Sequence, residues 1–168
     1  MNYVINKSAQ LRSENLVSII QDLIINKGEI LEIGCNAGRN LNYLYQAGYT
    51  DLTGIEINKN ALNQFKLSFN ECYQNINIIN SSIEESITKI SDQKYDIVFT
   101  MAVLQHIHPT SDWIFDHMVR ISRGFLITME VEEFPSPRHF PRNYKKIFES
   151  RGMRQIKRIH TARIFKRK

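Results

Sequence analysis

The sequence predicts an α/β fold: a doubly wound, mostly parallel sheet of about seven strands with helices on both faces. Short apolar runs alternate along the chain with longer segments in which apolar residues recur every three or four positions. The 168 residues are the length of one ordinary domain. The apolar fraction of 42% and the charged fraction of 23% are typical of globular proteins. Alternating strands and helices in a chain of this size predict a parallel sheet joined by crossover helices.

The predicted elements begin with a helix. Its apolar stripe runs from Leu16 to Ile24, Ser13 is a candidate N-cap, and Gly28 is expected to end it. Five strands are then expected at residues 30–33, 52–55, 76–79, 95–99 and 124–129. Helices are expected after each of them, at residues 41–48, 58–69, 83–90, 111–122 and 141–152. Met153–Ile159 and Ala162–Phe165 are expected to close the sheet as an antiparallel pair.

The positive charge of the chain is confined to its last segment. The formal net charge is +5, but Arg151–Lys168 carries eight Lys and Arg and no acid, which leaves 14 bases against 17 acids in residues 1–150. A nucleic-acid partner is therefore open but not favoured. No apolar run approaches a membrane span and the N-terminus lacks a signal-peptide core, so we expect a cytoplasmic protein with no membrane partner. Cys35 and Cys72 are too few for a disulfide scaffold or a zinc site.

The loop after the first strand carries the most informative motif. From Glu32 to Gly38 it has the pattern E-x-G-x-N-x-G. A dinucleotide fingerprint would require glycine at 34, 36 and 39, but positions 36 and 39 are Asn and Arg. This departure argues against a nicotinamide-dependent oxidoreductase. Asn36 is the non-glycine residue that best tolerates a positive φ, so the loop can keep a glycine-like conformation.

This loop resembles the first motif of the class I S-adenosylmethionine-dependent methyltransferases, which have a Rossmann-like fold. The resemblance implies that Glu32 orients the loop and approaches the amino group of the cofactor; the alternative is a solvated loop carboxylate. It also implies that the backbone passes close to the methionine part of the cofactor. The loop residues so assigned are Gly34, Cys35, Asn36, Gly38 and Asn40.

The ends of the next three predicted strands extend the resemblance. Glu56, followed by Ile57, stands where family members hold the two ribose hydroxyls. Ser82 and Ile83 stand at the adenine position, although Ser82 is equally suited to cap a helix. The resemblance further implies that the methionine and methyl-donor end is lined by Thr100, Met101 and Ala102.

The candidate catalytic residues are His106, which matches a family histidine, and His139, whose unperturbed pKa suits a base near neutral pH. Further candidates for a base lie in residues 130–133 and 136–144. Four residues are candidates for binding the acceptor: Arg12, Glu132, Arg142 and Tyr144. For Arg142 and Tyr144 the alternative is that they only pack the start of a helix.

The resemblance covers residues 29–108 and implies one methyltransferase-like domain over 1–168. Within it we expect a helical cap at 1–28, the cofactor-binding core at 29–108, and acceptor-side loops with the closing strands at 109–168. The implied cofactor is S-adenosylmethionine, which becomes S-adenosylhomocysteine by in-line displacement, with no metal required.

The leading hypothesis is methyl transfer to an N or O atom of a small-molecule acceptor, such as a sugar or other metabolite. Two alternatives remain: an RNA-modifying methyltransferase that uses the basic C-terminal segment, and a non-catalytic cofactor-binding subunit. The sequence carries no signal for oligomeric state.

Overall fold

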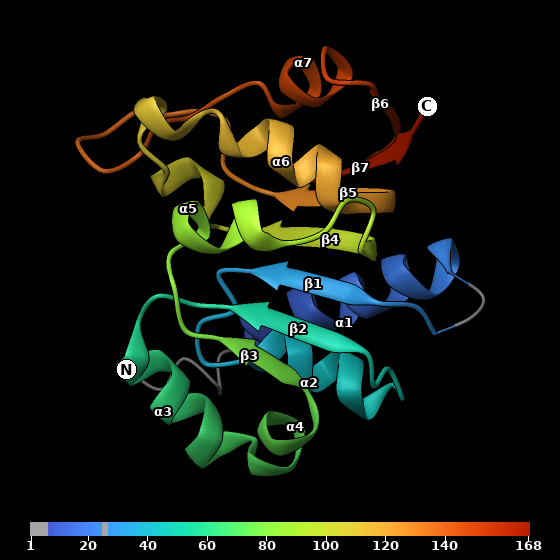
Figure 1. The fold of residues 1–168 in the computed structure, drawn as a ribbon, viewed down its shortest axis with the longest axis vertical. Coiled ribbons are helices and arrows are strands. Elements are labelled where there is room, and N and C mark those ends of the chain that lie inside the picture. Colours follow the sequence, from blue (N-terminus) through green and yellow to red (C-terminus); the bar gives the residue numbers. More distant parts are fainter. Residues whose placement is uncertain (1–6, 25–26) are drawn as a thin grey trace. The chain divides into compact units, whose positions relative to one another are not determined.

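The computed structural model describes residues 7–24 and 27–168, which group into two compact units. The first unit ends at Ser81 and the second runs from Ser82 to Lys168. Figure 1 shows the first in blue to green and the second in green to red. The prediction that residues 1–168 form one domain stays a prediction. No helix within the described ranges is long and apolar enough to cross a membrane.

The first unit contains a parallel sheet in the order β3-β2-β1. Ile30 pairs with Leu52 and Ile33 with Ile55, so β1 and β2 end together. Helix α2 packs on β2 and also contacts α1. The elements in chain order are α1 (Lys7–Leu23), β1 (Ile30–Ile33), α2 (Arg39–Gln46), β2 (Leu52–Ile55), α3 (Lys59–Ser68), α4 (Asn70–Asn75) and β3 (Asn77–Ile79).

The second unit contains a mixed sheet in the order β4-β5-β7-β6, in which β4 and β5 are parallel and β7 is antiparallel to both of its neighbours. Helix α6 packs on β4 and β5, and α7 on β6 and β7. The elements are α5 (Ile83–Ser86), η1 (Ile87–Lys89), β4 (Tyr95–Met101), η2 (Leu104–His106), η3 (Pro109–Ser111), α6 (Ile114–Ile121), β5 (Ser122–Met129), α7 (Tyr144–Glu149), β6 (Met153–Ile159) and β7 (Ala162–Arg167).

The predicted fold class is confirmed. Seven strands form within residues 7–24 and 27–168, and the last two make an antiparallel pair. All four residues of β1 and all four of β2 are buried, as expected for parallel strands covered on both faces. In the second unit the side chains of Phe115, Tyr144, Phe148 and Phe165 are fully buried and in ring contact with one another. These four rings join α6, α7 and β7 into one core.

Three predicted boundaries are wrong, each for a local reason. Helix α1 begins at Lys7 and ends at Leu23, so Ser13 lies in its interior rather than at its N-cap. Helix α6 leads directly into β5 at Ser122, two residues before the predicted strand. Helix α7 begins at Tyr144 because the Asn143 side chain accepts a hydrogen bond from the Lys146 N–H, which makes Asn143 the cap in place of a start at Pro141.

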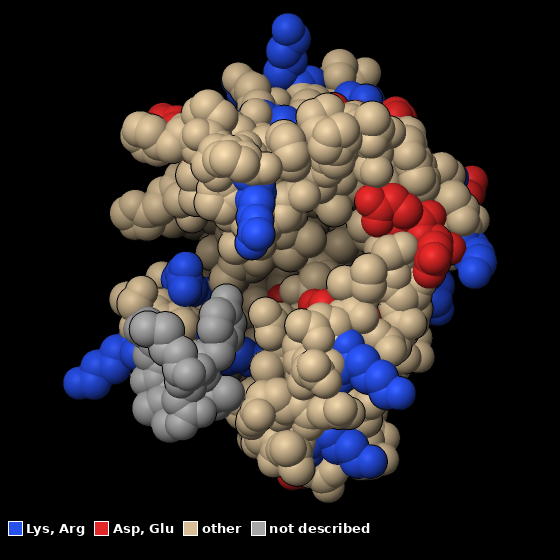
Figure 2. All heavy atoms as spheres, turned by 90° about the vertical axis from the view of Figure 1, so that its left-hand side faces the viewer, with Lys and Arg blue, Asp and Glu red and all other residues tan. Residues whose placement is uncertain are grey.

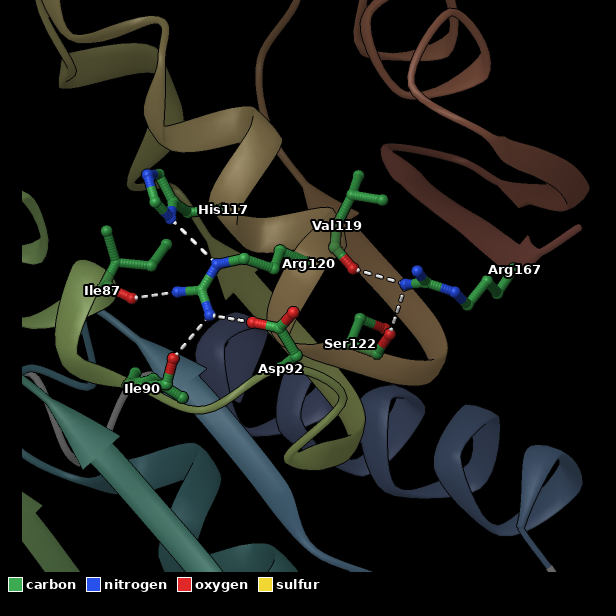
Figure 3. A network of polar contacts seen from close by, with 8 residues as sticks. All are labelled: Ile87, Ile90, Asp92, His117, Val119, Arg120, Ser122 and Arg167. Atoms are coloured by element: carbon green, nitrogen blue, oxygen red, sulfur yellow. Dashed lines mark hydrogen bonds and ion pairs between the residues drawn. The ribbon is translucent and has the colours of Figure 1, made fainter.

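Arginine side chains donate hydrogen bonds to backbone carbonyl groups at turns of the second unit (Figure 3). The guanidinium of Arg120, on α6, donates to the carbonyl oxygens of Ile87 at 2.8 Å and Ile90 at 2.7 Å, and pairs with Asp92. They give the Ile90 carbonyl, just after η1, a side-chain donor, and they give the Ile87 carbonyl a second donor beside the Ile90 N–H. Arg167 similarly donates to the carbonyl oxygens of Val119 and Ser122, where α6 passes into β5.

We expect Arg120→Met to lower the free energy of unfolding by about 1–3 kcal/mol, because it removes hydrogen bonds to two partly buried carbonyl groups. Urea unfolding followed by circular dichroism measures this change. The control is Arg123→Met, which removes the ion pair of a more exposed arginine with Asp96 and should change stability by less than about 1 kcal/mol. Equal decreases in the free energy of unfolding of the two variants would contradict a stabilising role for the hydrogen bonds of Arg120.

Candidate active site

The loop between β1 and α2 has a backbone path that needs small or permissive residues. Gly34, Asn36 and Gly38 have φ values of 74°, 49° and 72°, in the left-handed region. The backbone N–H groups of Gly34 and Cys35 both donate to the carbonyl oxygen of Ile55, at 2.8 and 3.0 Å. Asn36 accepts a hydrogen bond from the Ala37 N–H through its own side chain. The loop is thereby held against the end of β2 in one conformation.

Gly38 also makes room for a packed ring. A Cβ atom at this position would lie 2.3 Å from the ring of Phe65, a fully buried residue of α3. Any side chain at position 38 would therefore push α3 away from the start of α2. Position 38 needs glycine for two reasons, its positive φ and this close approach, whereas its contact with the cofactor stays a prediction.

Glu56 fixes the same loop from the end of β2. One carboxylate oxygen, Oε2, accepts from the Asn36 N–H at 2.9 Å, and Oε1 accepts from the Asn58 N–H at 2.7 Å. The side chain is half-buried. A carboxylate has about four lone-pair positions, so these two bonds leave room for two more donors. Ile57, next to it, is 68% exposed.

Glu32 is a buried carboxylate, so the alternative that it is a solvated loop residue is wrong. It is 1% exposed, and burial raises its pKa from 4.5 to about 8. Its Oε1 accepts from the Asn40 side-chain amide at 2.6 Å, whereas its Oε2 has no hydrogen-bond partner among the described residues. Asn40 was predicted to contact the cofactor; its side-chain amide donates to Glu32, and a cofactor contact stays a prediction. A buried unpartnered oxygen of this kind marks a position where a donor group can bind.

The side chain of Cys35 belongs to the core rather than to the surface of the loop. Its thiol is buried, and burial raises its pKa far above the ordinary value. A Cβ atom at Gly54 would come within 2.8 Å of the Cys35 sulfur and 2.7 Å of Leu41. The side chain of Cys35 is therefore not available to a ligand.

In the second unit, Ser82 is the N-cap of α5. Its hydroxyl accepts from the Glu85 N–H at 3.2 Å, which is the capping alternative considered from the sequence. Ile83 is buried. At the end of β4, Thr100 is buried, Met101 is half-buried and Ala102 is exposed with a φ of 57°. Adenine and methionine contacts for these residues stay predictions.

Glu130, at the end of β5, organises the loop that follows β4. It is 3% exposed, and its carboxylate accepts from the backbone N–H groups of Val103 and Gln105. Burial raises its pKa. It was one of the predicted candidates for a base, but its contacts hold a loop in place. Nothing in the local sequence distinguishes it from Glu132 and Glu133, because its partners lie more than twenty residues away.

His106 and His139 lie together, with ring centroids 4.8 Å apart. The Nδ1 atom of His106 is 3.0 Å from the Arg138 carbonyl oxygen, which can only accept, so Nδ1 carries the proton. Its Nε2 is then an acceptor for the Gln105 amide, 3.4 Å away. Both nitrogens of His106 are thus occupied within the protein. No side-chain hydrogen bond of His139 is found among the described residues.

Three of the four residues predicted to bind the acceptor are occupied by internal contacts. Arg142 donates to the carbonyl oxygens of Leu104, Phe140 and Ile107 and pairs with Asp112. Tyr144 is fully buried. Both side chains pack near the start of α7, and an acceptor contact for either of them stays a prediction. Glu132 forms a two-pronged ion pair with Arg163. Arg12 is exposed on α1.

No group of three or more His, Cys, Asp or Glu side chains in residues 7–24 and 27–168 is arranged to hold a metal ion.

Comparison with known proteins identifies the family. The model of a family described as "Methyltransferase domain" matches residues 30–123, more than half of the chain. The chain belongs to the methyltransferase domain family. The comparison with curated protein sequences gives no match. The predicted membership of a methyltransferase family is thus confirmed.

Solved structures of this methyltransferase fold resemble the whole chain. The PH0226 protein from Pyrococcus horikoshii OT3 aligns with a TM-score of 0.79 and 12% identity, over 98% of this chain and 93% of that one. Magnesium protoporphyrin IX methyltransferase from Synechocystis PCC 6803, with bound SAM, aligns with a TM-score of 0.74 and 18% identity. The alignment covers 100% of this chain and 85% of that one. The 1,6-didemethyltoxoflavin-N1-methyltransferase of Burkholderia thailandensis, with bound 1,6-didemethyltoxoflavin and S-adenosylhomocysteine, aligns with a TM-score of 0.75 and 11% identity. The alignment covers 99% of this chain and 81% of that one.

The buried carboxylate makes the stability of this methyltransferase domain depend on pH. The pKa of Glu32 is higher in the folded protein than in the unfolded chain. The contribution of the protonated Glu32 side chain to folding stability is therefore fully present below pH 4.5 and is lost as pH rises through about 8. Glu32→Gln removes this titration. We expect the variant to gain stability relative to the wild type as pH rises from 5 to 8, by up to about 1.4 kcal/mol per pH unit. Urea unfolding at pH 5, 6.5 and 8 measures the gain, and parallel curves would contradict it.

Proposed function

We propose that the chain transfers the methyl group of S-adenosylmethionine to a nitrogen or oxygen atom of a small-molecule acceptor. The observation that carries the proposal is the buried Glu32 carboxylate, whose Oε2 has no hydrogen-bond partner in the described part of the chain, just before a loop with three positive φ values. A cationic amino group is the ligand chemistry that best satisfies such an oxygen. The small-molecule class is supported by two structural neighbours whose acceptors are a porphyrin and a toxoflavin precursor.

The residues of the first unit fit the two polar ends of this cofactor. Glu32 would pair with the amino group of its methionine part, and the free lone pairs of Glu56 would accept from the two ribose hydroxyls. The backbone of residues 34–38 would lie along the methionine part, with no side chain at Gly34 or Gly38 in the way. Charge-assisted bonds to two carboxylates fix the orientation of the ligand as well as its affinity.

The bound cofactor supplies a methyl group on a positively charged sulfur. The acceptor lone pair forms the new bond to this methyl carbon as the carbon–sulfur bond breaks, and the electron pair stays on sulfur. An acceptor that arrives as an ammonium or hydroxyl group must also lose a proton. His139 is the better candidate to take this proton, because both nitrogens of His106 already have partners.

The alternative of an RNA substrate receives little support from the C-terminal segment. Arg151 pairs with Asp116, Arg163 with Glu132, and Arg167 donates to two carbonyl groups (Figure 3). Three of the eight Lys and Arg of this segment are therefore used inside the second unit, whereas Arg154, Lys157 and Arg158 are exposed. On the face drawn in Figure 2, Lys and Arg side chains stand apart and form no continuous basic patch. Phosphate-rich ligands need several free cations on one surface.

Transfer of a labelled methyl group tests the function. The protein and labelled S-adenosylmethionine are incubated with separate metabolite, RNA and protein fractions, and incorporation is counted in each. The proposal expects label in the metabolite fraction alone. Label in RNA would favour the RNA-modifying alternative. Binding without transfer to any fraction would favour the non-catalytic subunit.

We expect Glu56→Gln to weaken S-adenosylhomocysteine binding about 10- to 100-fold, because the neutral amide loses the charge-assisted bonds to the ribose and releases the Asn36 N–H. Isothermal titration calorimetry measures the change. Asp51→Asn, at an exposed acid before β2, is the matched control and should bind like the wild type. Unchanged binding by Glu56→Gln would remove Glu56 from the site.

We expect His139→Gln to lower kcat about 10²- to 10⁴-fold near pH 7, the range for loss of a general base, and to flatten the pH dependence of kcat. S-adenosylhomocysteine affinity should stay within about threefold of the wild type, since the cofactor contacts proposed above come from the first unit. His160→Asn is the control, because His160 is exposed and Asn tolerates its positive φ. An unchanged pH profile would show that His139 is not the base.

A further inference from the structure

Four buried polar side chains form a continuous chain of hydrogen bonds through the first unit. Ser13 comes from α1, Arg39 and Asn40 from the first turn of α2, and Glu32 from β1. Their exposed fractions are 0%, 7%, 6% and 1%. Arg39 Nε lies 3.0 Å from Ser13 Oγ, Ser13 Oγ 2.7 Å from Asn40 Oδ1, and Asn40 Nδ2 2.6 Å from Glu32 Oε1.

The direction of each bond in this chain follows from the first donor. A guanidinium N–H can only donate, so the Ser13 oxygen accepts from Arg39. The Ser13 hydroxyl hydrogen is then turned toward the Asn40 carbonyl oxygen, which is closer than its other neighbour, the Ala9 carbonyl at 3.3 Å. This fixes the Asn40 amide with its NH₂ group toward Glu32. Every donor in the chain therefore points toward the carboxylate.

We propose that Ser13, Arg39 and Asn40 are positioning residues that hold the Glu32 carboxylate by Oε1 alone, so that Oε2 is left to bind the amino group of the cofactor. This inference rests on the proposed function and names residues that act through Glu32 rather than on the ligand. If the Asn40 amide turned over, its oxygen would face the carboxylate and Glu32 would lose its one donor. The Ser13 hydroxyl prevents this.

The polar groups of this hydrogen-bonded chain also favour the ionised form of Glu32. Burial raises the pKa of Glu32, and both the Asn40 hydrogen bond and the positive charge of Arg39 lower it. Without the chain, the carboxyl group would stay neutral at a higher pH and would bind an ammonium group less well. The chain thus favours the protonation state that a cationic ligand needs.

Helix α1 gains a specific role from this arrangement. Serine is a neutral to poor residue in a helix interior, and a fully buried one needs a partner for its hydroxyl. Ser13 finds two partners on α2. The helix before β1 therefore orients the amide that orients the carboxylate, in addition to packing on α2.

The test compares Ser13→Val with Ser13→Thr, two side chains of nearly equal shape that differ in the hydroxyl. S-adenosylhomocysteine binding is measured by calorimetry from pH 6 to 8.5. Wild-type affinity should rise with pH, by up to about tenfold per unit, and level off near pH 8 as Glu32 ionises. We expect Ser13→Val to bind at least about tenfold more weakly at pH 7 and to keep gaining affinity up to pH 8.5. Ser13→Thr should stay within about threefold of the wild type.

The controls separate the hydroxyl from helix packing. Ser18→Val and Ser18→Thr change an exposed serine of the same helix and should bind like the wild type. If Ser13→Val does not fold, Asn40→Leu, which has nearly the shape of asparagine, breaks the chain at its next link. It should show the same weakened binding and the same shift of its pH dependence.

Unfolding of the protein without ligand provides a readout that does not depend on cofactor binding. The chain stabilises ionised Glu32, so the stability lost in Ser13→Val relative to Ser13→Thr should grow between pH 7 and 9. A wild type that binds no S-adenosylhomocysteine would overturn the proposed function and leave this measurement intact. Equal pH profiles for the valine and threonine variants, in binding and in unfolding, would overturn the positioning role.

Discussion

The burial of one carboxylate in the middle of the first strand shapes the whole first unit. An isolated charge transferred from water into a protein interior is unfavourable by several kcal/mol, so Glu32 persists only because other groups compensate for it. The amide of Asn40 supplies one hydrogen bond, and the start of α2 brings that amide into place. The position of α2 depends in turn on Gly38, whose missing side chain lets Phe65 approach. The packing of Phe65 against Gly38 and the hydrogen bond from Asn40 to Glu32 thus both depend on the position of the start of α2.

The two units use the same device at the ends of their strands. In the first, Glu56 accepts backbone N–H groups from the loop after β1 and from its own loop. In the second, Glu130 accepts two N–H groups from the loop after β4. Loops at the carboxyl ends of parallel strands contain many backbone donors without partners in the sheet. A carboxylate at the next strand end satisfies them and sets the loop conformation before any ligand arrives.

Much of the first unit could be predicted from the sequence, because its motif is local. Glu32, Gly34, Gly38 and Glu56 lie at or beside strand ends, and their types follow from backbone path and charge within a few residues. The contacts of Arg142 and Glu132 could not be predicted, since their partners Ile107 and Arg163 come from distant segments. Ser13 was assigned to a helix start because serine favours caps, and only its contacts with α2 reveal a different role.

The thiol of Cys35 has a consequence for the chemical durability of the protein. A cysteine in a glycine-containing loop near a reactive sulfonium would be open to alkylation or oxidation if it were exposed and ionised. Here Gly54 leaves a space that the sulfur fills, and burial keeps the thiol protonated. The loop therefore carries an inert sulfur, and oxidants or electrophiles in the surroundings have no nucleophile to attack at this position.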